Sequence, residues 1–296
     1  MKAPESYKLL GIDIGTTSLK AAVFDGTGKR LAVRSVDYTL DTDAETGFIE
    51  FDANAYIVMC RRVIAELEAE CGKIDALSVD TQGETLILTD AAGKPLCPAV
   101  VWLDNRAVAE AEAIKEKFGN KLVYEVTGQP EITAGWPASK LLWFKNNKPE
   151  IFAATEKIFM LEDWVLYNLC GEFVTEPTIQ SSTIYMDVTK NVWWQEMLDF
   201  IGVSKDVLPE LLDSGIYVGD YAGIKVTTGA MDQVSGAIGA GVVKPGIVSV
   251  MTGTTMVIFT PSEGVPATIP PASCPVITIT TANTVCFPGR PRRAWH

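Results

Sequence analysis

The stretch YKLLGIDIGTTSLKAAVFDGTGKRLAV, residues 7–33, predicts three consecutive strands joined by two glycine-containing turns. Asp13 stands near the end of the first strand, and Gly-Thr-Thr follows at residues 15–17. Glycine lets a backbone approach a ligand closely, and consecutive amides flanked by hydroxyls can hold an anion. The turn therefore favours a phosphate site, although Gly-Thr-Thr is also a favourable hairpin turn with no ligand.

Helical spacing of apolar residues follows at 54–71, where Gly72 is the expected stop. The segments IDALSVD and TLILTD then predict buried strands on either side of TQGE. This β-β-β-α-β order indicates an α/β fold with a mixed sheet flanked by helices, because continuous apolar strands need both faces covered. Further helices are expected at residues 105–118, 137–147 and 160–170.

The pattern restarts at residue 224 with GIKVTTGAMDQVSGAIGAGVVKPGIVSVMTGTTMVIF. It predicts a strand, a helix of small residues, and two strands around a second Gly-Thr-Thr at 253–255. The recurrence suggests two related domains that each lend one phosphate loop.

Asp232 opens the predicted helix of small residues, where it could simply cap the helix. The sole histidine is His296, so a Ser-His-Asp relay, an HExxH zinc site and an imidazole base are excluded. Acid–base chemistry must then come chiefly from carboxylates. Asp232 is the candidate that would take a proton from a hydroxyl attacking a γ-phosphate.

Composition restricts the partners. A net charge of −12 supplies no general basic field, so we expect no nucleic-acid partner. No segment approaches 18 uninterrupted apolar residues, so neither a signal peptide nor a membrane span is expected. Six cysteines are scattered without Cys-x-x-Cys spacing, which favours buried thiols over metal or redox roles. The predicted localisation is cytoplasmic.

Seven segments together resemble the FGGY family of carbohydrate kinases, and they occur in that family's order. They are GIDIGTTSLKAAVFD, SVDTQGETLIL, AVVWLDNRA, PASKLLWFKNNKPEIF, MLEDWVLYNLCGEFVTE, TTGAMDQVSGAIGAG and VSVMTGTTMVI. The resemblance covers residues 8 to about 260. It implies the actin-like, ribonuclease H-like ATPase fold, in which ATP and a sugar meet between two domains.

Matched position by position, the resemblance implies two phosphate-binding loops, ATP and Mg²⁺ as cofactors, and a catalytic base. Asp232 resembles the base, and Asp13 would lie nearest the Mg²⁺. The first loop would comprise Asp13, Gly15, Thr16 and Thr17, and the second Thr252, Gly253, Thr254 and Thr255.

The expected acceptor is a sugar or polyol. Thr-Gln-Gly-Glu-Thr at 81–85 resembles the Gln-Arg-Glu-Thr of glycerol kinases, but Gly83 replaces the arginine. The framework around ASKLLWFKNNKPEIF and GEF resembles xylulokinases, which carry Met-His after the glutamine. Alternatives remain open: Trp136 could be a core residue, and Asp104 with Arg106 an exposed ion pair. The predicted substrate-binding residues are Gln82, Glu84, Asp104, Arg106, Trp136, Asp232 and Gln233.

The expected domains are an N-terminal sugar-kinase domain at 1–244, the start of a C-terminal ATP-binding domain at 245–275, and a tail at 276–296. The second domain would thus be truncated. The tail changes character abruptly and ends in PGRPRRAWH. Permissive codons from Val276 onward can be read in the neighbouring frame as a family-like peptide, so we predict an out-of-frame tail.

The predicted function is ATP-dependent phosphorylation of a sugar or polyol hydroxyl. A pentulose such as xylulose is favoured, with glycerol and pentitols as alternatives and a homodimer as one expected assembly. Two rival hypotheses are a truncated sugar-binding remnant without catalysis and another ATPase of the same fold. The last lacks the Gln-x-Glu-Thr and Trp-x-Asp-x-Arg segments present here.

Overall fold

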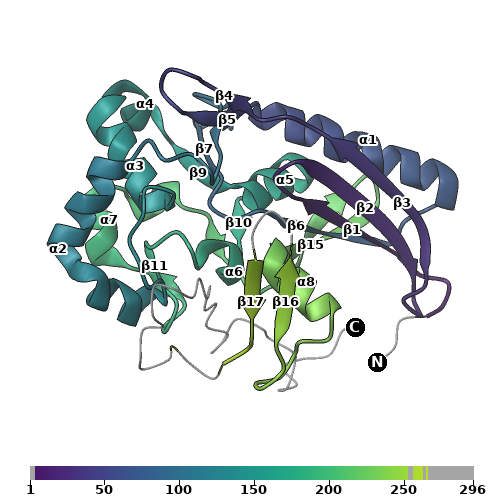
Figure 1. Cartoon of the computed structure of the whole chain (residues 1–296). Helices are drawn as coiled ribbons and strands as arrows, with labels where there is room; N and C mark the ends of the chain where they lie inside the picture. Colours follow the sequence, from purple (N-terminus) through teal and green to yellow (C-terminus); the bar gives the residue numbers. More distant parts are fainter. Residues whose placement is uncertain (1–3, 253–255, 263–264, 266–296) are drawn as a thin grey trace.

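The computed structural model describes residues 4–252, 256–262 and 265. It has the expected α/β organisation, with a six-stranded mixed sheet, a five-stranded antiparallel sheet, three two-stranded sheets and helices packed around them (Figure 1). The predicted residues Gly253, Thr254 and Thr255 and the predicted tail at 276–296 lie outside the described residues. Within the described part of the chain, no helix is long and apolar enough to cross a membrane.

The larger sheet has six strands in the order β14-β15-β6-β1-β2-β3. The first three strands of the chain form an antiparallel meander, and β6 and β15 run parallel to β1. The strand–turn–strand prediction for residues 7–33 is therefore confirmed. The bounds are β1 (Lys8–Ile14), β2 (Ser18–Asp25), β3 (Arg30–Asp37), β6 (Ala76–Thr81), β14 (Tyr217–Tyr221) and β15 (Ile224–Met231).

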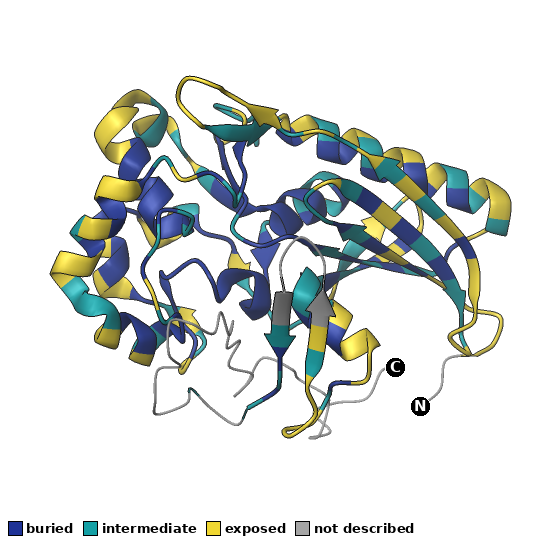
Figure 2. Ribbon diagram, viewed as in Figure 1, coloured by how far each residue is buried: buried dark blue, intermediate teal, exposed yellow. Residues whose placement is uncertain are grey.

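Helix α1 (Ala53–Cys71) packs on β2 and β3, and α5 (Leu161–Cys170) on β6, β14 and β15. The apolar face of α1 is buried while its outer face is exposed (Figure 2). The Asp52 carboxylate accepts a hydrogen bond from the Asn54 N–H at 2.9 Å, and Gly72 ends the helix with a φ of 75°. Local signals thus set both ends of α1, and the predicted stop at Gly72 is confirmed.

The second sheet has the order β4-β5-β8-β7-β9 and packs with α2, α3, α4 and α7 around a separate core. Its strands are β4 (Asp41–Thr42), β5 (Ile49–Phe51), β7 (Leu86–Thr89), β8 (Ala99–Val100) and β9 (Lys157–Met160). The helices are α2 (Val108–Thr127), α3 (Pro137–Asn147), α4 (Pro149–Ala154) and α7 (Gln195–Ile201).

Helix α2 differs from its predicted range of 105–118. It begins three residues later and continues beyond Gly119, which has a φ of 70° and interrupts the helical geometry. Glycine tolerates this left-handed conformation without strain, so the chain kinks and resumes its helix. The predicted end at residue 118 was wrong because Val123 and Tyr124, beyond the kink, are buried and the helix continues to include them.

Short elements complete the described chain, and one of them opens on Asp232. Helix α8 (Asp232–Gly239) directly follows β15, as predicted. The others are β10 (Val174–Thr175), α6 (Pro177–Gln180), β11 (Met186–Asp187), β12 (Val192–Trp193), the 3₁₀ helix η1 (Lys205–Val207), β13 (Glu210–Leu211), β16 (Ser249–Thr252) and β17 (Met256–Phe259). Strands β16 and β17 pair antiparallel beside α8 (Figure 1).

Candidate active site

A pocket of about 520 Å³ opens where the carboxyl ends of β1, β6 and β15 meet. Parallel strands end at the same edge of a sheet, which is where ligands of open α/β sheets bind. The wall comes from the loops that follow β1, β6 and β8, from the loop before α3, from the segment after α6 and from the start of α8. The lining residues are Thr16, Gln82, Gly83, Glu84, Trp102, Leu103, Asn105, Thr133, Gly135, Trp136, Ser182, Met231, Asp232 and Gln233.

The structure brings together six of the residues singled out from sequence, although they are up to 217 positions apart. The predicted residues that line the pocket are Thr16, Gln82, Glu84, Trp136, Asp232 and Gln233. Those that do not line it are Asp13, Gly15, Thr17, Asp104 and Arg106. Thr252 ends β16, and its side chain is not described. The roles assigned to all these residues stay predictions.

Asp232 is the first residue of α8, and its carboxylate faces the pocket. Its Oδ1 accepts a hydrogen bond from the Gln233 N–H at 2.7 Å. Burial raises the pKa of Asp232 to about 7, the hydrogen bond from Gln233 opposes that shift, and the charges of Asp13 and Glu84 add to it. A carboxylate with a pKa near neutrality has the properties of a general base.

Asp80 is a further acidic residue at this edge, and the sequence analysis did not single it out. It pairs in register with Asp13 on the adjacent parallel strand, and the two carboxyl groups interact by a hydrogen bond. Burial, followed by the charges of Asp13 and Asp232, raises the pKa of Asp80 to about 8. An acidic residue at the end of the predicted strand IDALSVD could have been noticed in the sequence. That its partner is Asp13 follows only from the strand register.

The donor set at Asp13 suits Mg²⁺, which takes few carboxylates and keeps waters and phosphate oxygens as its other ligands. Burial raises the pKa of Asp13, while Lys20 and the hydrogen bond with Asp80 lower it. Among the described residues, no cluster of three or more histidine, cysteine or acidic side chains has the arrangement of a metal site. Any metal here would therefore need non-protein ligands as well.

Asp80→Asn tests whether Asp80 carries the proton of its hydrogen bond with Asp13 at neutral pH. A carboxyl whose pKa is raised on folding binds its proton more tightly in the folded state, so stability falls as pH rises from about 4 to 8. Asparagine mimics the protonated acid and removes that penalty. We expect the variant to gain at least about 1 kcal/mol at pH 8 and nothing at pH 4, measured by urea unfolding without divalent cations. An equal effect at both pH values would contradict the assignment.

The turn at residues 15–18 is held by its own hydrogen bonds. The Gly15 N–H donates to the Ser18 carbonyl at 3.0 Å, and the Tyr38 hydroxyl donates to the Gly15 carbonyl. The Trp102 Nε1–H donates to the Thr16 hydroxyl at 2.9 Å, joining this turn to the pocket wall. Because the Gly15 amide is engaged within the turn, phosphate contacts here would have to come from Thr16 and Thr17.

Asp104 and Arg106 form a buried ion pair beside the pocket. Arg106 Nε lies 2.8 Å from Asp104 Oδ1, its Nη2 lies 2.7 Å from Glu50, and the Arg106 side chain is only 3% exposed. Burial would raise the pKa of Asp104, but hydrogen bonds from Arg106 and the Ile49 N–H hold it below its usual value. This arrangement differs from the exposed pair considered from sequence. The neighbours Trp102 and Asn105 face the pocket instead.

Glu84 reaches the pocket from a strained backbone position with a φ of 55°. The Lys140 ammonium group is fully buried and donates to the Val101 carbonyl at 2.8 Å and the Glu84 carbonyl at 3.4 Å. Burial lowers the pKa of Lys140 to about 7. Lys140 thus ties together the two segments that carry Glu84 and Trp102.

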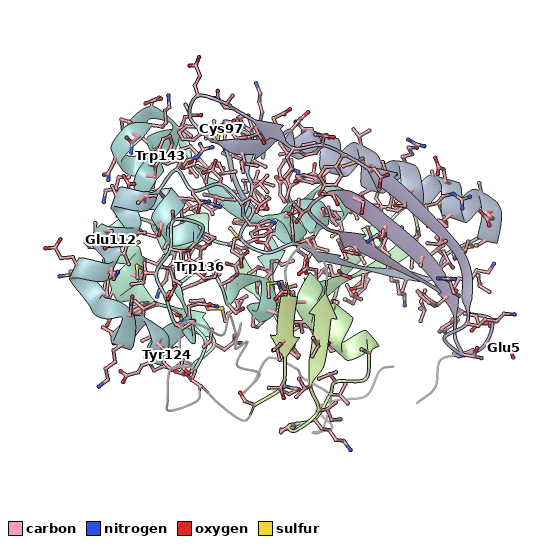
Figure 3. The ribbon with its side chains drawn as sticks, viewed as in Figure 1. Glu5, Cys97, Glu112, Tyr124, Trp136 and Trp143 are labelled. Atoms are coloured by element: carbon pink, nitrogen blue, oxygen red, sulfur yellow. The ribbon has the colours of Figure 1, made fainter. Side chains whose placement is uncertain are left out.

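Two tryptophans form the apolar part of the wall. The Trp136 Nε1–H donates to the Glu131 carbonyl at 2.8 Å, which fixes the ring just before α3. Figure 3 places Trp136 toward the centre of the molecule, whereas Trp143 lies near the α3–α4 corner. Trp136 lines the pocket and also packs against the core, whereas Trp143 belongs to the core; a substrate contact of Trp136 stays a prediction. Trp102 is an additional ring that the sequence analysis did not choose.

Two amide oxygens at the pocket are buried without a hydrogen-bond partner among the described residues. They are Gln82 Oε1 and Gln233 Oε1. The Gln82 Nε2 donates to the Tyr56 hydroxyl at 3.3 Å, which fixes the orientation of that amide. Buried polar atoms are rarely left unpaired, so these oxygens are acceptors available to hydroxyl donors of a ligand.

The mixed sheet, the acidic residues at its strand ends and the polar pocket beside them define an α/β protein with a candidate ligand site at one sheet edge. Residues 8–241 match the N-terminal domain of the FGGY family of carbohydrate kinases. The chain therefore belongs to this family.

Two curated relatives are similar to this chain to the same degree. A xylulose kinase of Lactococcus lactis subsp. lactis is 28% identical over 84% of this chain and 52% of the relative. An autoinducer-2 kinase of Salmonella typhimurium is also 28% identical, over 84% of this chain and 50% of the relative. The chain spans about half the length of the curated relatives it matches.

The fold is that of a solved xylulose kinase from Lactobacillus acidophilus. That structure superposes with a TM-score of 0.81 at 27% identity, covering 86% of this chain and 54% of the other. The mixed sheet flanked by helices is thus the actin-like ATPase fold of sugar kinases, represented here by about half of the relative's length.

Proposed function

We propose that this chain is part of an ATP-dependent kinase that phosphorylates an uncharged sugar or polyol. The observation that carries this proposal is the position of Asp232 in the wall of a polar pocket, beside unpaired amide oxygens of Gln82 and Gln233. Xylulose-like pentuloses are the favoured acceptors, because the similar proteins include xylulose kinases.

In the proposed reaction, Asp232 accepts the proton of the acceptor hydroxyl as its oxygen attacks the γ-phosphorus of ATP. The new P–O bond forms as the bond from the γ-phosphorus to ADP breaks, and ADP leaves. Thr16, Thr17 and the second Gly-Thr-Thr turn would contact the phosphates. Mg²⁺ bound near Asp13 would compensate phosphate charge, as is general for phosphoryl transfer.

The acceptor is uncharged because the charged side chains lining the described pocket, Glu84 and Asp232, are both acidic. Two basic groups lie close by but are engaged elsewhere. Arg106 is neutralised by Asp104 and Glu50, and Lys140 donates to two backbone carbonyls. The negative electrostatic potential in the pocket therefore disfavours binding of a sugar acid, whose carboxylate is also negative.

The proposal is tested by ADP release from ATP–Mg²⁺ with pentuloses, pentitols, glycerol, glucitol and gluconate. The assay is run on this chain and on a version extended through the reading frame that the coding DNA provides. Activity with a neutral acceptor and none with gluconate is expected. A folded extended protein that binds a sugar but releases no ADP with any acceptor would leave the sugar-binding hypothesis instead.

The activity of Asp232 as a base predicts the pH profile. The residue must be deprotonated to act, so kcat/KM for the acceptor should fall tenfold per pH unit below about pH 7. Glu84→Gln removes a negative charge that raises the pKa of Asp232. In this variant the acid limb, the fall of kcat/KM on the acid side of the profile, should therefore begin at a lower pH. Glu66→Gln, on the outer side of α1, is the control. An unmoved limb in Glu84→Gln would contradict the proposed coupling.

A further inference from the structure

Strand β15 contains a bulge immediately before Asp232. Thr227 pairs with Ser78 of β6, but the next pair joins Ala230 to Asp80, so β15 holds one extra residue. A bulge re-aims the side chains that follow it, because a one-residue shift moves each to the opposite face of the strand. The bulge thus decides which way Met231 and Asp232 leave the sheet.

The bulge depends on Gly229. A Cβ at this position would lie 1.7 Å from the Val79 carbonyl oxygen. Thr228 turns the other way: its N–H donates to the Ile216 carbonyl at 2.9 Å, and its hydroxyl donates to the Asp213 carbonyl at 2.8 Å. The irregular backbone leaves the amides of Gly229 and Met231 in need of acceptors outside the β6–β15 ladder.

Two buried side-chain groups supply these acceptors. The Gly229 N–H donates to Glu162 Oε1 at 2.8 Å, and the Met231 N–H donates to the Thr178 hydroxyl oxygen at 2.7 Å. Thr178 in turn donates its proton to Glu176 Oε1 at 2.5 Å. Glu162, Glu176 and Thr178 are all fully buried, so water does not substitute for these contacts.

Glu176 is itself rigidly held. Its carboxylate accepts hydrogen bonds from the Thr178 N–H at 2.8 Å and the Ile179 N–H at 2.5 Å at the start of α6, and from the Ser214 hydroxyl at 2.6 Å. The same carboxylate therefore fixes the Thr178 hydroxyl, the first turn of α6 and the segment that leads into β14. This network lies behind the pocket, and none of its three anchors lines it.

We propose that Glu162 and the Glu176–Thr178 pair are positioning residues that hold the β15 bulge and thereby set the place of Asp232. The catalytic part of this inference rests on the proposed function, in which Asp232 is the base. A base displaced by about 1 Å loses much of its effect, with rate losses on the order of 10²-fold. The anchors act through the backbone and touch no reacting atom.

Thr178→Val is the first test, because valine keeps the shape and removes the acceptor of the Met231 N–H. We expect amide hydrogen exchange in residues 224–239 to rise at least about tenfold and kcat to fall about 10- to 100-fold, with the KM for ATP unchanged. A less buried Asp232 also has a lower pKa, so the acid limb of kcat/KM should move to lower pH.

Two variants separate positioning from general destabilisation. Thr178→Ser retains the hydroxyl. In this variant the amide exchange of residues 224–239, kcat and the pH at which kcat/KM falls on the acid side should equal those of the parent protein. Thr127→Val removes a buried hydroxyl that donates to the Val123 carbonyl at 2.7 Å at the end of α2. It should lower stability without moving the pH limb or the exchange of residues 224–239.

A second pair keeps the inference testable if Thr178→Val does not fold. Glu162→Gln retains an oxygen for the Gly229 N–H, whereas Glu162→Met does not, so only the latter should raise exchange in residues 224–239. Unchanged exchange in both Thr178→Val and Glu162→Met would overturn the inference. If the parent protein phosphorylates no acceptor, the proposed function fails, but the exchange comparison still decides whether these groups hold the bulge.

Discussion

Asp232→Asn is expected to lower kcat for phosphoryl transfer by about 10²- to 10⁴-fold. Asparagine has almost the same shape, and its Oδ1 can still accept the Gln233 N–H that Asp232 accepts at 2.7 Å. The side chain cannot accept a proton from the acceptor hydroxyl, so the loss should appear in kcat. The measurement is ADP release at saturating ATP–Mg²⁺ and acceptor, with acceptor binding followed by calorimetry.

Stability provides an independent check on the same variant. Because burial raises the pKa of Asp232 to about 7, the folded state holds its proton more tightly than the unfolded chain does. The charged form therefore lowers stability as pH rises from about 4 to 7, and Asp232→Asn should be the more stable protein at pH 8. Asp41→Asn, at an exposed position in β4, is the matched control. Retained kcat in Asp232→Asn would exclude this residue as the base.

Gly229→Ala is expected to destabilise the fold by about 3 kcal/mol or more, or to prevent folding. The added Cβ would lie 1.7 Å from the Val79 carbonyl oxygen and 2.8 Å from its carbonyl carbon. Both are backbone atoms of the adjacent strand, so no side chain can move aside. Relief requires β15 to separate from β6, which breaks the ladder that carries Asp80 and ends at Met231, just before Asp232.

The control for this prediction is Gly11→Ala in the same sheet. A Cβ at Gly11 meets no atom within 4 Å among the described residues. Gly11→Ala should therefore be neutral or slightly stabilising, because alanine restricts the unfolded chain. Urea unfolding of both variants gives the comparison, and equal stabilities would contradict the close approach of β15 and β6.

Much of the fold was accessible from local patterns. The alternation in residues 7–33 predicted β1, β2 and the start of β3, and helical spacing with Gly72 predicted α1. These elements are specified by nearby residues through strand alternation, turns and caps. Helix α2 was mispredicted because burial of Val123 and Tyr124 outweighs the local helix-breaking tendency of Gly119.

The candidate site was only partly accessible. Motifs identified Gln82, Glu84 and Asp232, which line one pocket. The motif WLDNR was recognised, but its pocket-facing members are Trp102 and Asn105, since Asp104 is turned to Arg106 and the Ile49 N–H. Side-chain direction within an irregular loop depends on its hydrogen-bond partners, which lie far away in sequence.

Local patterns and motifs were enough to predict the first three strands, α1, the β15–α8 segment, the family, and the residue types available for acid–base chemistry. Those features depend on neighbouring residues and on motif identity. The pairing of Asp80 with Asp13, and the hydrogen bonds from the Gly229 and Met231 amides to Glu162 and Thr178, become visible only in the folded chain. The physical reason is that strand register, the bulge at Gly229 and mutual burial arise from contacts between segments distant in the chain.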